Sequence, residues 1–230
     1  MANVSETFLT QGHAISVEVC QHVSQPQPAI LVLHGADGPN ARRKSYLRLA
    51  NGIAEHDYTV FLVHYFDRTG TVTADRETTR NCFLDWRKTV IDAVVFAAAH
   101  PSVLTDSVGL LGFSLGATLA LSVAGRLRRI RAVAEFSGAM PDPSVFMMRM
   151  PPALIVHGGK DEVVRVEEAY KLERLLQERN IAYEIEVYPK EGHLLRADAY
   201  ADAFRKTALF FDKYLRRADV SVDNSNVQSG

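Results

Sequence analysis

A serine, an acid and a histidine occur along this chain in an order that suits nucleophilic catalysis. Ser114 is the centre of a G-x-S-x-G motif, Asp161 ends the segment H-G-G-K-D, and His193 ends the segment E-G-H. A neutral serine hydroxyl is a weak nucleophile, so a histidine must take its proton and an acid must fix the histidine tautomer. We therefore expect Ser114 to act as nucleophile, His193 as base and Asp161 as the acid that orients it.

The residues around Ser114 predict the strand, turn and helix that such a nucleophile needs. The apolar run over 108–111 is typical of a buried strand, and the small and apolar residues from Ala117 onward favour a helix. Gly112 and Gly116 leave room for a tight turn in which the serine backbone is strained. Because three fixed residues also occur together by chance, the interpretation depends on the partners of Ser114.

The oxyanion of an acyl-transfer intermediate needs backbone N–H donors close to the nucleophile. We expect one donor from Leu115, directly after the serine, and another from Ala36, in the loop H-G-A-D-G that follows an apolar run over 29–33. Glu162 and Glu135 are alternative acids, because one directly follows the predicted acid and the other ends a further predicted strand.

Strands and helices alternate through most of the chain. Strands are predicted over 4–10, 14–20, 29–33, 59–63, 107–112, 130–136, 153–156 and 182–187, and helices over 41–56, 81–99, from 117 onward, over 166–178 and over 197–216. This alternation predicts an α/β fold with a mostly parallel central sheet, helices on both faces, and functional residues at the carboxyl ends of the strands. We expect residues 1–217 to form a single domain and the polar segment 218–230 to be a disordered tail.

Composition argues against several classes of partner. The net charge of −1 gives no reason to expect nucleic acid or an acidic membrane surface. No apolar stretch is long enough to span a membrane, and the N-terminus lacks the regions of a signal peptide. Cys20 and Cys82 are too few for a disulfide framework and favour a reducing cytoplasm. No two histidines have metal-ligand spacing, so we expect neither a metal nor a cofactor, and the oligomeric state is left open.

On these motifs the chain resembles the dienelactone hydrolase family of the α/β-hydrolase superfamily, over about residues 14–216. The resemblance rests on the segments H-G-A-D-G at 34–38, Y-F-D-R at 65–68, G-F-S-L-G at 112–116, H-G-G-K-D at 157–161 and E-G-H at 191–193. It implies an α/β-hydrolase fold, and the short stretch between the strands at 130–136 and 153–156 leaves no room for a substantial lid domain. The enzymes that give the family its name use a cysteine nucleophile, so Ser114 favours a general serine esterase.

The resemblance also implies residues that hold a substrate carboxylate. In the family, arginines do this, one of them just after the strand that here ends at Tyr65. Arg68 matches that place, and Arg196 lies near the place of a second arginine after the catalytic histidine. Tyr65, Arg68 and Arg196 are therefore candidate substrate-binding residues.

The function predicted from the sequence is hydrolysis of a carboxylic or thiol ester, or a lactone, of a small molecule through an acyl-serine intermediate. Two alternatives have the same fold. One is a hydrolase of short peptides or acyl-peptides, which the three catalytic residues alone do not separate from an esterase. The other is a non-catalytic protein that binds a ligand, which a degraded set of catalytic residues would favour.

Overall fold

Eight strands form a single sheet in the computed structural model, which describes residues 2–23, 25–142 and 149–216. The strands are β1 Ala2–Thr10, β2 His13–Gln21, β3 Gln27–Leu33, β4 Thr59–Val63, β5 Val103–Phe113, β6 Ile130–Phe136, β7 Ala153–Gly158 and β8 Tyr183–Tyr188. They lie in the order β1-β2-β4-β3-β5-β6-β7-β8. β1 and β2 pair antiparallel with their neighbours and the remaining pairs are parallel, as predicted. The tail predicted over 218–230 lies outside the described residues.

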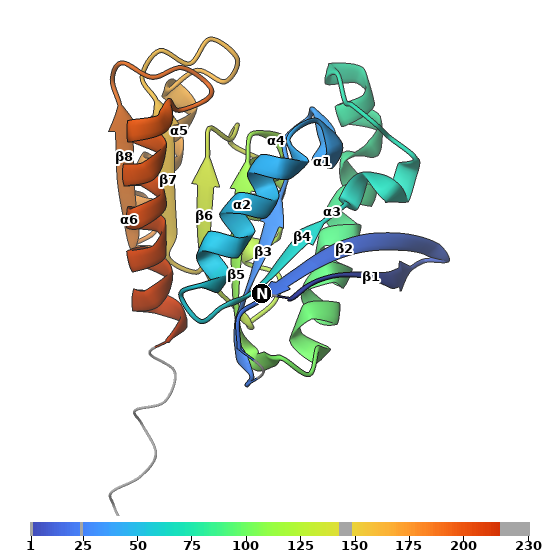
Figure 1. Cartoon of the computed structure of the whole chain (residues 1–230). Coiled ribbons are helices and arrows are strands. Elements are labelled where there is room, and N and C mark those ends of the chain that lie inside the picture. Colours follow the sequence, from blue (N-terminus) through green and yellow to red (C-terminus); the bar gives the residue numbers. More distant parts are fainter. Residues whose placement is uncertain (1, 24, 143–148, 217–230) are drawn as a thin grey trace, which may run out of the picture.

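Helices cover both faces of this sheet (Figure 1). They are α1 Gly38–Ala41, α2 Arg43–Ala54, the 3-10 helix η1 Tyr65–Thr69, α3 Arg76–Ala99, α4 Leu115–Ala124, α5 Glu167–Glu178 and α6 Ala197–Leu215. Core residues of α3, α4 and α5 pack together against one face, and those of α2 and α6 pack against the other. None of the described helices is long and apolar enough to cross a bilayer.

The central strands are apolar throughout because both of their faces are covered. In β3, Leu31 and Leu33 pack toward α3 and α4, whereas Ile30 and Val32 pack toward α2 and α6. All four side chains are completely buried. Because β3 to β8 pair in parallel, their carboxyl ends meet at one edge of the sheet.

Several boundaries differ from those predicted by the sequence, and the start of the long helix α3 differs by five residues. The long helix α3 begins at Arg76 rather than near residue 81, because Asp75 caps it by accepting a hydrogen bond from the Thr78 N–H at 2.8 Å. The segment 67–79 therefore contains part of η1 and the first turn of α3. Because α3 begins earlier than predicted, the side chains of its first turn lie at the edge of the sheet where the parallel strands end.

The connection between β6 and β7 is short, as expected. It consists of the 16 residues from 137 to 152, and its described parts, 137–142 and 149–152, contain neither helix nor strand. No large lid domain is present in the described chain.

Candidate active site

Ser114 lies at the carboxyl end of β5, on the turn that leads directly into α4. Its φ is +52° and its ψ is −116°, a conformation that costs a residue with a side chain on the order of 1–3 kcal/mol. The motif glycines allow this turn to form. A Cβ on Gly112 would lie 2.3 Å from the carbonyl oxygen of Gly116, and a Cβ on Gly116 would lie 2.3 Å from that of Leu33. The pattern G-x-S-x-G is thus required by close backbone contacts on both sides of the serine.

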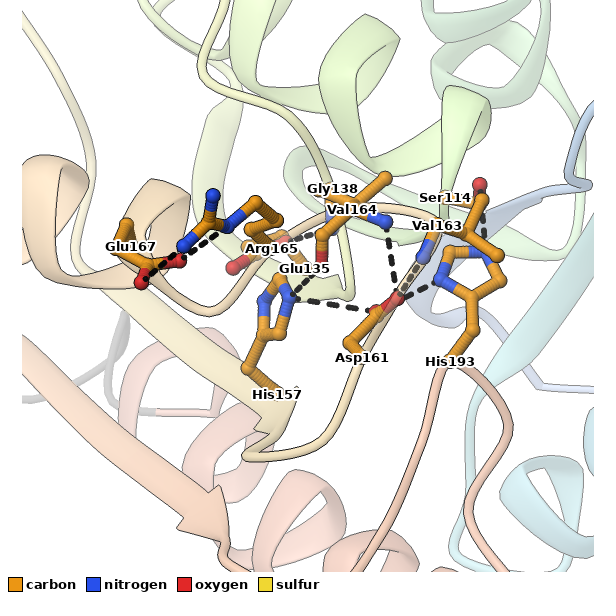
Figure 2. A network of polar contacts seen from close by, with 10 residues as sticks. All are labelled: Ser114, Glu135, Gly138, His157, Asp161, Val163, Val164, Arg165, Glu167 and His193. Carbon is orange, nitrogen blue, oxygen red and sulfur yellow. Dashed lines mark hydrogen bonds and ion pairs between the residues drawn. The ribbon is translucent and has the colours of Figure 1, made fainter.

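His193 lies between Ser114 and Asp161 (Figure 2). Its Nε2 is 3.0 Å from Ser114 Oγ, and its Nδ1 is 2.7 Å from Asp161 Oδ2. An ionised aspartate can only accept a hydrogen bond, so His193 Nδ1 must carry the hydrogen that it donates to Asp161. His193 Nε2 is then free to accept the proton of the Ser114 hydroxyl. The three side chains form a continuous chain of hydrogen bonds along which a proton can leave the serine.

The carboxylate of Asp161 is fixed by several contacts and is buried. Its Oδ1 accepts hydrogen bonds from the backbone N–H groups of Val163 at 2.8 Å and Val164 at 2.9 Å. The fully buried His157 lies on its other side, with Nε2 3.4 Å from Oδ2 and within 2.8 Å of the Val164 carbonyl oxygen (Figure 2). These contacts hold the carboxylate in the orientation that faces His193.

Neither of the two alternative acids contacts His193. Glu162 is exposed. Glu135 is buried at the end of β6, and its Oε2 accepts a hydrogen bond from the Gly138 N–H at 2.8 Å. Asp161 is therefore the acid that the fold brings to the histidine.

The loop that follows β3 is held in place through its carbonyl groups. The His34 carbonyl oxygen accepts a hydrogen bond from the Tyr65 hydroxyl at 2.7 Å, and the Ala36 carbonyl oxygen accepts one from the Ala74 N–H at 2.8 Å. The His34 ring also stacks on the Tyr65 ring, with centroids 4.0 Å apart. Burial lowers the pKa of His34 to about 3, so its ring is neutral and packs as an aromatic group.

Two backbone N–H groups beside Ser114, those of Ala36 and Leu115, have no hydrogen-bond partner within the described part of the chain. Leu115 is the first residue of α4, where helical N–H groups lack an acceptor within the helix. Ala36 lines both cavities that adjoin Ser114. A negative oxygen formed on a group bound to Ser114 could accept hydrogen bonds from both, at the favourable end of the helix dipole.

Two cavities open on either side of Ser114, and Ala36 and Val163 line both of them. The smaller cavity has a volume of about 270 Å³ and is also lined by His193. The larger has a volume of about 570 Å³ and is also lined by Leu115. A ligand attacked by Ser114 therefore has two separate spaces for its two parts.

The larger cavity carries an excess of positive charge. Arg76 and Arg80, four residues apart in the first two turns of α3, line it together with the helix cap Asp75. Both arginines are exposed, and neither has an ion-pair or hydrogen-bond partner among the residues described. Two guanidinium groups against one carboxylate leave a net charge of +1.

The three residues predicted to bind substrate do not line either cavity. Tyr65 is completely buried, and its hydroxyl holds the loop that follows β3. Arg68 points to the hairpin of β1 and β2, where it donates to the Thr10 carbonyl oxygen at 3.1 Å. Arg196 is paired with Glu191 at 2.7 Å, and 75% of its side chain is exposed. The structure thus brings together the predicted serine, histidine, aspartate and N–H donors, but not these three residues.

Sequence reasoning missed Arg76 and Arg80. A signal was present, since Asp75 is a favoured helix N-cap residue and arginines four residues apart share a helix face. Placing that face beside Ser114 depends on the contact between Ala74 and Ala36, which no local pattern specifies.

The chain is similar to known proteins in sequence and in fold. The model of the dienelactone hydrolase family matches residues 15–215. A carboxymethylenebutenolidase of Rhodococcus opacus is 27% identical over 192 residues, which cover 74% of this chain and 76% of the relative. A probable 2-oxo-3-(5-oxofuran-2-ylidene)propanoate lactonase of Bradyrhizobium sp is 30% identical over 141 residues, or 54% of this chain and 55% of the relative.

Among solved structures, a dienelactone hydrolase-like promiscuous phosphotriesterase from metagenomic libraries superposes with a TM-score of 0.81. The match covers 93% of this chain and 98% of that one, at 16% identity. At this identity the likeness establishes the fold alone, which is that of an α/β-hydrolase.

Proposed function

Because the chain belongs to the dienelactone hydrolase family and is an ester-bond hydrolase, we propose that it cleaves a small-molecule ester or lactone through an acyl-Ser114 intermediate. In this proposal Ser114 is the nucleophile, His193 the general base and acid, and Asp161 the residue that orients the imidazole. The observation that best supports this proposal is the pair of hydrogen bonds that links Ser114 Oγ to His193 and His193 to Asp161. Ser114 lies at the turn between β5 and α4.

The reaction follows from this geometry. As Ser114 Oγ bonds to the substrate carbonyl carbon, its proton passes to His193 Nε2, and Asp161 stabilises the imidazolium. The carbonyl oxygen becomes negative and accepts hydrogen bonds from the N–H groups of Ala36 and Leu115. The bond to the leaving oxygen then breaks, and that oxygen takes the proton from Nε2. Water repeats the sequence to release the acid and restore Ser114. With a lactone, the leaving oxygen stays part of the acyl group as its hydroxyl, so water releases a single hydroxy acid.

We further propose that the acyl part of the substrate carries a carboxylate. Arg76 and Arg80 support this proposal, because they are unpaired guanidinium groups in a cavity that reaches Ser114, and guanidinium groups bind carboxylates through charge-assisted hydrogen bonds. Arg76 and Arg80 replace Arg68 and Arg196 as the arginines to test.

The experiment that tests the proposal compares the wild type with Ser114→Ala. The wild type should react with a fluorophosphonate probe and hydrolyse a short-chain p-nitrophenyl ester, and the variant should do neither while keeping its circular dichroism spectrum. Full esterase activity of Ser114→Ala would refute the nucleophile assignment. A wild type that neither labels nor turns over would instead favour the non-catalytic alternative. Faster hydrolysis of a short peptide p-nitroanilide than of the matched ester would favour the peptidase alternative.

A further inference from the structure

The smaller cavity lies on the side of Ser114 from which a leaving group must depart. His193 lines this cavity and is absent from the lining of the larger one. The leaving oxygen has to come within hydrogen-bond distance of His193 Nε2 to receive its proton. The group attached to that oxygen is therefore directed into the smaller cavity, and the acyl chain is directed into the larger cavity.

Aromatic and apolar side chains give the smaller cavity its shape. Tyr46, Phe113 and Phe136 line it, and the ring centroids of Phe113 and Phe136 lie 4.9 Å apart. At its mouth, Val163 is 70% exposed and Leu194 is 56% exposed. Large apolar side chains left this open next to a nucleophile can be covered by an apolar ligand. The volume of about 270 Å³ lies just below the common range of small-molecule pockets, which suits a single ring.

The smaller cavity has no excess charge from its arginine and aspartate, because these two side chains form an ion pair. Arg42 Nε lies 2.5 Å from Asp37 Oδ2, so the charges of this pair cancel. Among the polar side chains that line this cavity, that of Ser137 is the one for which the described chain offers no hydrogen-bond partner, and this residue is only 5% exposed and has a φ of +52°. A strained, buried residue with an uncommitted hydroxyl beside a reactive serine is a candidate for ligand contact.

We infer that the smaller cavity is a leaving-group subsite that takes a neutral, planar alcohol of one-ring size, with the Ser137 hydroxyl as a hydrogen-bond partner. This inference rests on the proposed function, because it needs Ser114 and His193 to act as nucleophile and general acid. It assigns the two cavities to different parts of the substrate, so the two can be tested separately.

The first test varies only the shape of the alcohol. Benzyl acetate and cyclohexylmethyl acetate have leaving alcohols of similar basicity, but one ring is planar and the other is puckered. We expect the wild type to prefer benzyl acetate in kcat/KM by about tenfold, a typical discrimination by a shaped apolar pocket. Leu194→Trp, which fills the exposed mouth, should reduce this preference, whereas Arg68→Gln, outside both cavities, should not. Equal rates on both esters, or loss of the preference in Arg68→Gln alone, would overturn the assignment.

The second test changes the charge of the cavity. Asp37→Asn removes the carboxylate that neutralises Arg42, so an ester with a carboxylate on its alcohol, 4-(acetoxymethyl)benzoate, should improve about tenfold relative to benzyl acetate. Benzyl hydrogen succinate, with its carboxylate on the acyl part, should not improve in the same way. An improvement of the succinate ester instead would show that the two cavities are assigned the wrong way round.

The result also separates this inference from the proposed function. Turnover of benzyl acetate by the wild type and its loss in Ser114→Ala support the hydrolase mechanism whatever the alcohol preference is. If turnover depends on Ser114 but the alcohol preferences are absent or reversed, only the subsite assignment fails.

Discussion

The Oε2 oxygen of Glu135 accepts a hydrogen bond from the Gly138 N–H at 2.8 Å, and this is the only hydrogen bond that the buried carboxyl group of Glu135 receives from the described chain. Its other oxygen, Oε1, is buried without a partner. A Cβ on Gly138 would lie 2.7 Å from Oε2 and 2.7 Å from the Ala117 Cβ in α4. A group that is costly to ionise is thus packed under the helix that carries Ser114.

Replacement of Glu135 by glutamine should stabilise the protein at high pH. Burial raises the pKa of Glu135 from 4.5 to about 8, against the opposing effect of the Gly138 hydrogen bond. Because the folded pKa is above the unfolded one, the native state binds the proton more tightly, and its stability falls as the pH rises from 4.5 to about 8. Glutamine does not titrate. The gain of Glu135→Gln in unfolding free energy should therefore grow over this window, to on the order of a few kcal/mol.

Urea unfolding at pH 5, 7 and 9 measures this effect. The exposed Glu178 supplies the control, since Glu178→Gln should change stability by a similar small amount at all three values. A gain from Glu135→Gln that is the same at pH 5 and pH 9 would contradict a raised pKa.

Loss of the acid beside the histidine should impair catalysis without unfolding the protein. Asp161→Asn keeps the size of the side chain, but its amide can donate to His193 Nδ1 and stabilise the wrong tautomer, so kcat should fall by about 10³ to 10⁴. The matched control is Glu162→Gln, because Glu162 is the exposed neighbour that sequence reasoning left as an alternative acid. Steady-state kinetics on a neutral aryl ester would decide between them: a larger loss in Glu162→Gln would reassign the acid.

The geometry of the site was predictable where it depends on strand ends and on local turns. Ser114, Asp161 and His193 follow β5, β7 and β8, and parallel strands bring their carboxyl ends to one edge whatever the details of packing are. Apolar runs and alternation likewise predicted the sheet and its two layers of helices.

Features that depend on long-range contacts were not predictable in this way. The direction of Arg68 is set by Thr10, which is 58 residues away in the chain. The segment before α3 is placed by the hydrogen bond from Ala74 to Ala36. No periodicity or spacing encodes such pairings, and so the sequence could not show that Arg68 lies outside the cavities at Ser114.

Removal of the arginines in the larger cavity should cost affinity for anionic acyl groups only. Arg80→Gln and Arg76→Gln should each lower kcat/KM for 4-nitrophenyl hydrogen succinate by about 10- to 100-fold, the value of a charged hydrogen bond. The neutral 4-nitrophenyl butanoate should change little. Arg68→Gln is the matched control, because Arg68 donates to the Thr10 carbonyl and lies outside both cavities. If the preference for the succinate ester over the butanoate ester falls in Arg68→Gln but persists in the other two variants, Arg68 is the residue that binds the substrate carboxylate.

Addition of a methyl group at Gly116 should damage the oxyanion hole more than the fold. The new Cβ would lie 2.3 Å from the Leu33 carbonyl oxygen and 2.5 Å from that of His34, so the loop that carries the Ala36 N–H has to move. Loss of one oxyanion donor typically lowers kcat by about 10² to 10³. We expect Gly116→Ala to show at least that loss. Gly52→Ala is the control, since its Cβ would meet only the end of the Phe204 ring at 3.3 Å. Kinetics and thermal unfolding of both variants, measured side by side, test this, and a Gly116→Ala enzyme with wild-type kcat would rule out Ala36 as a donor.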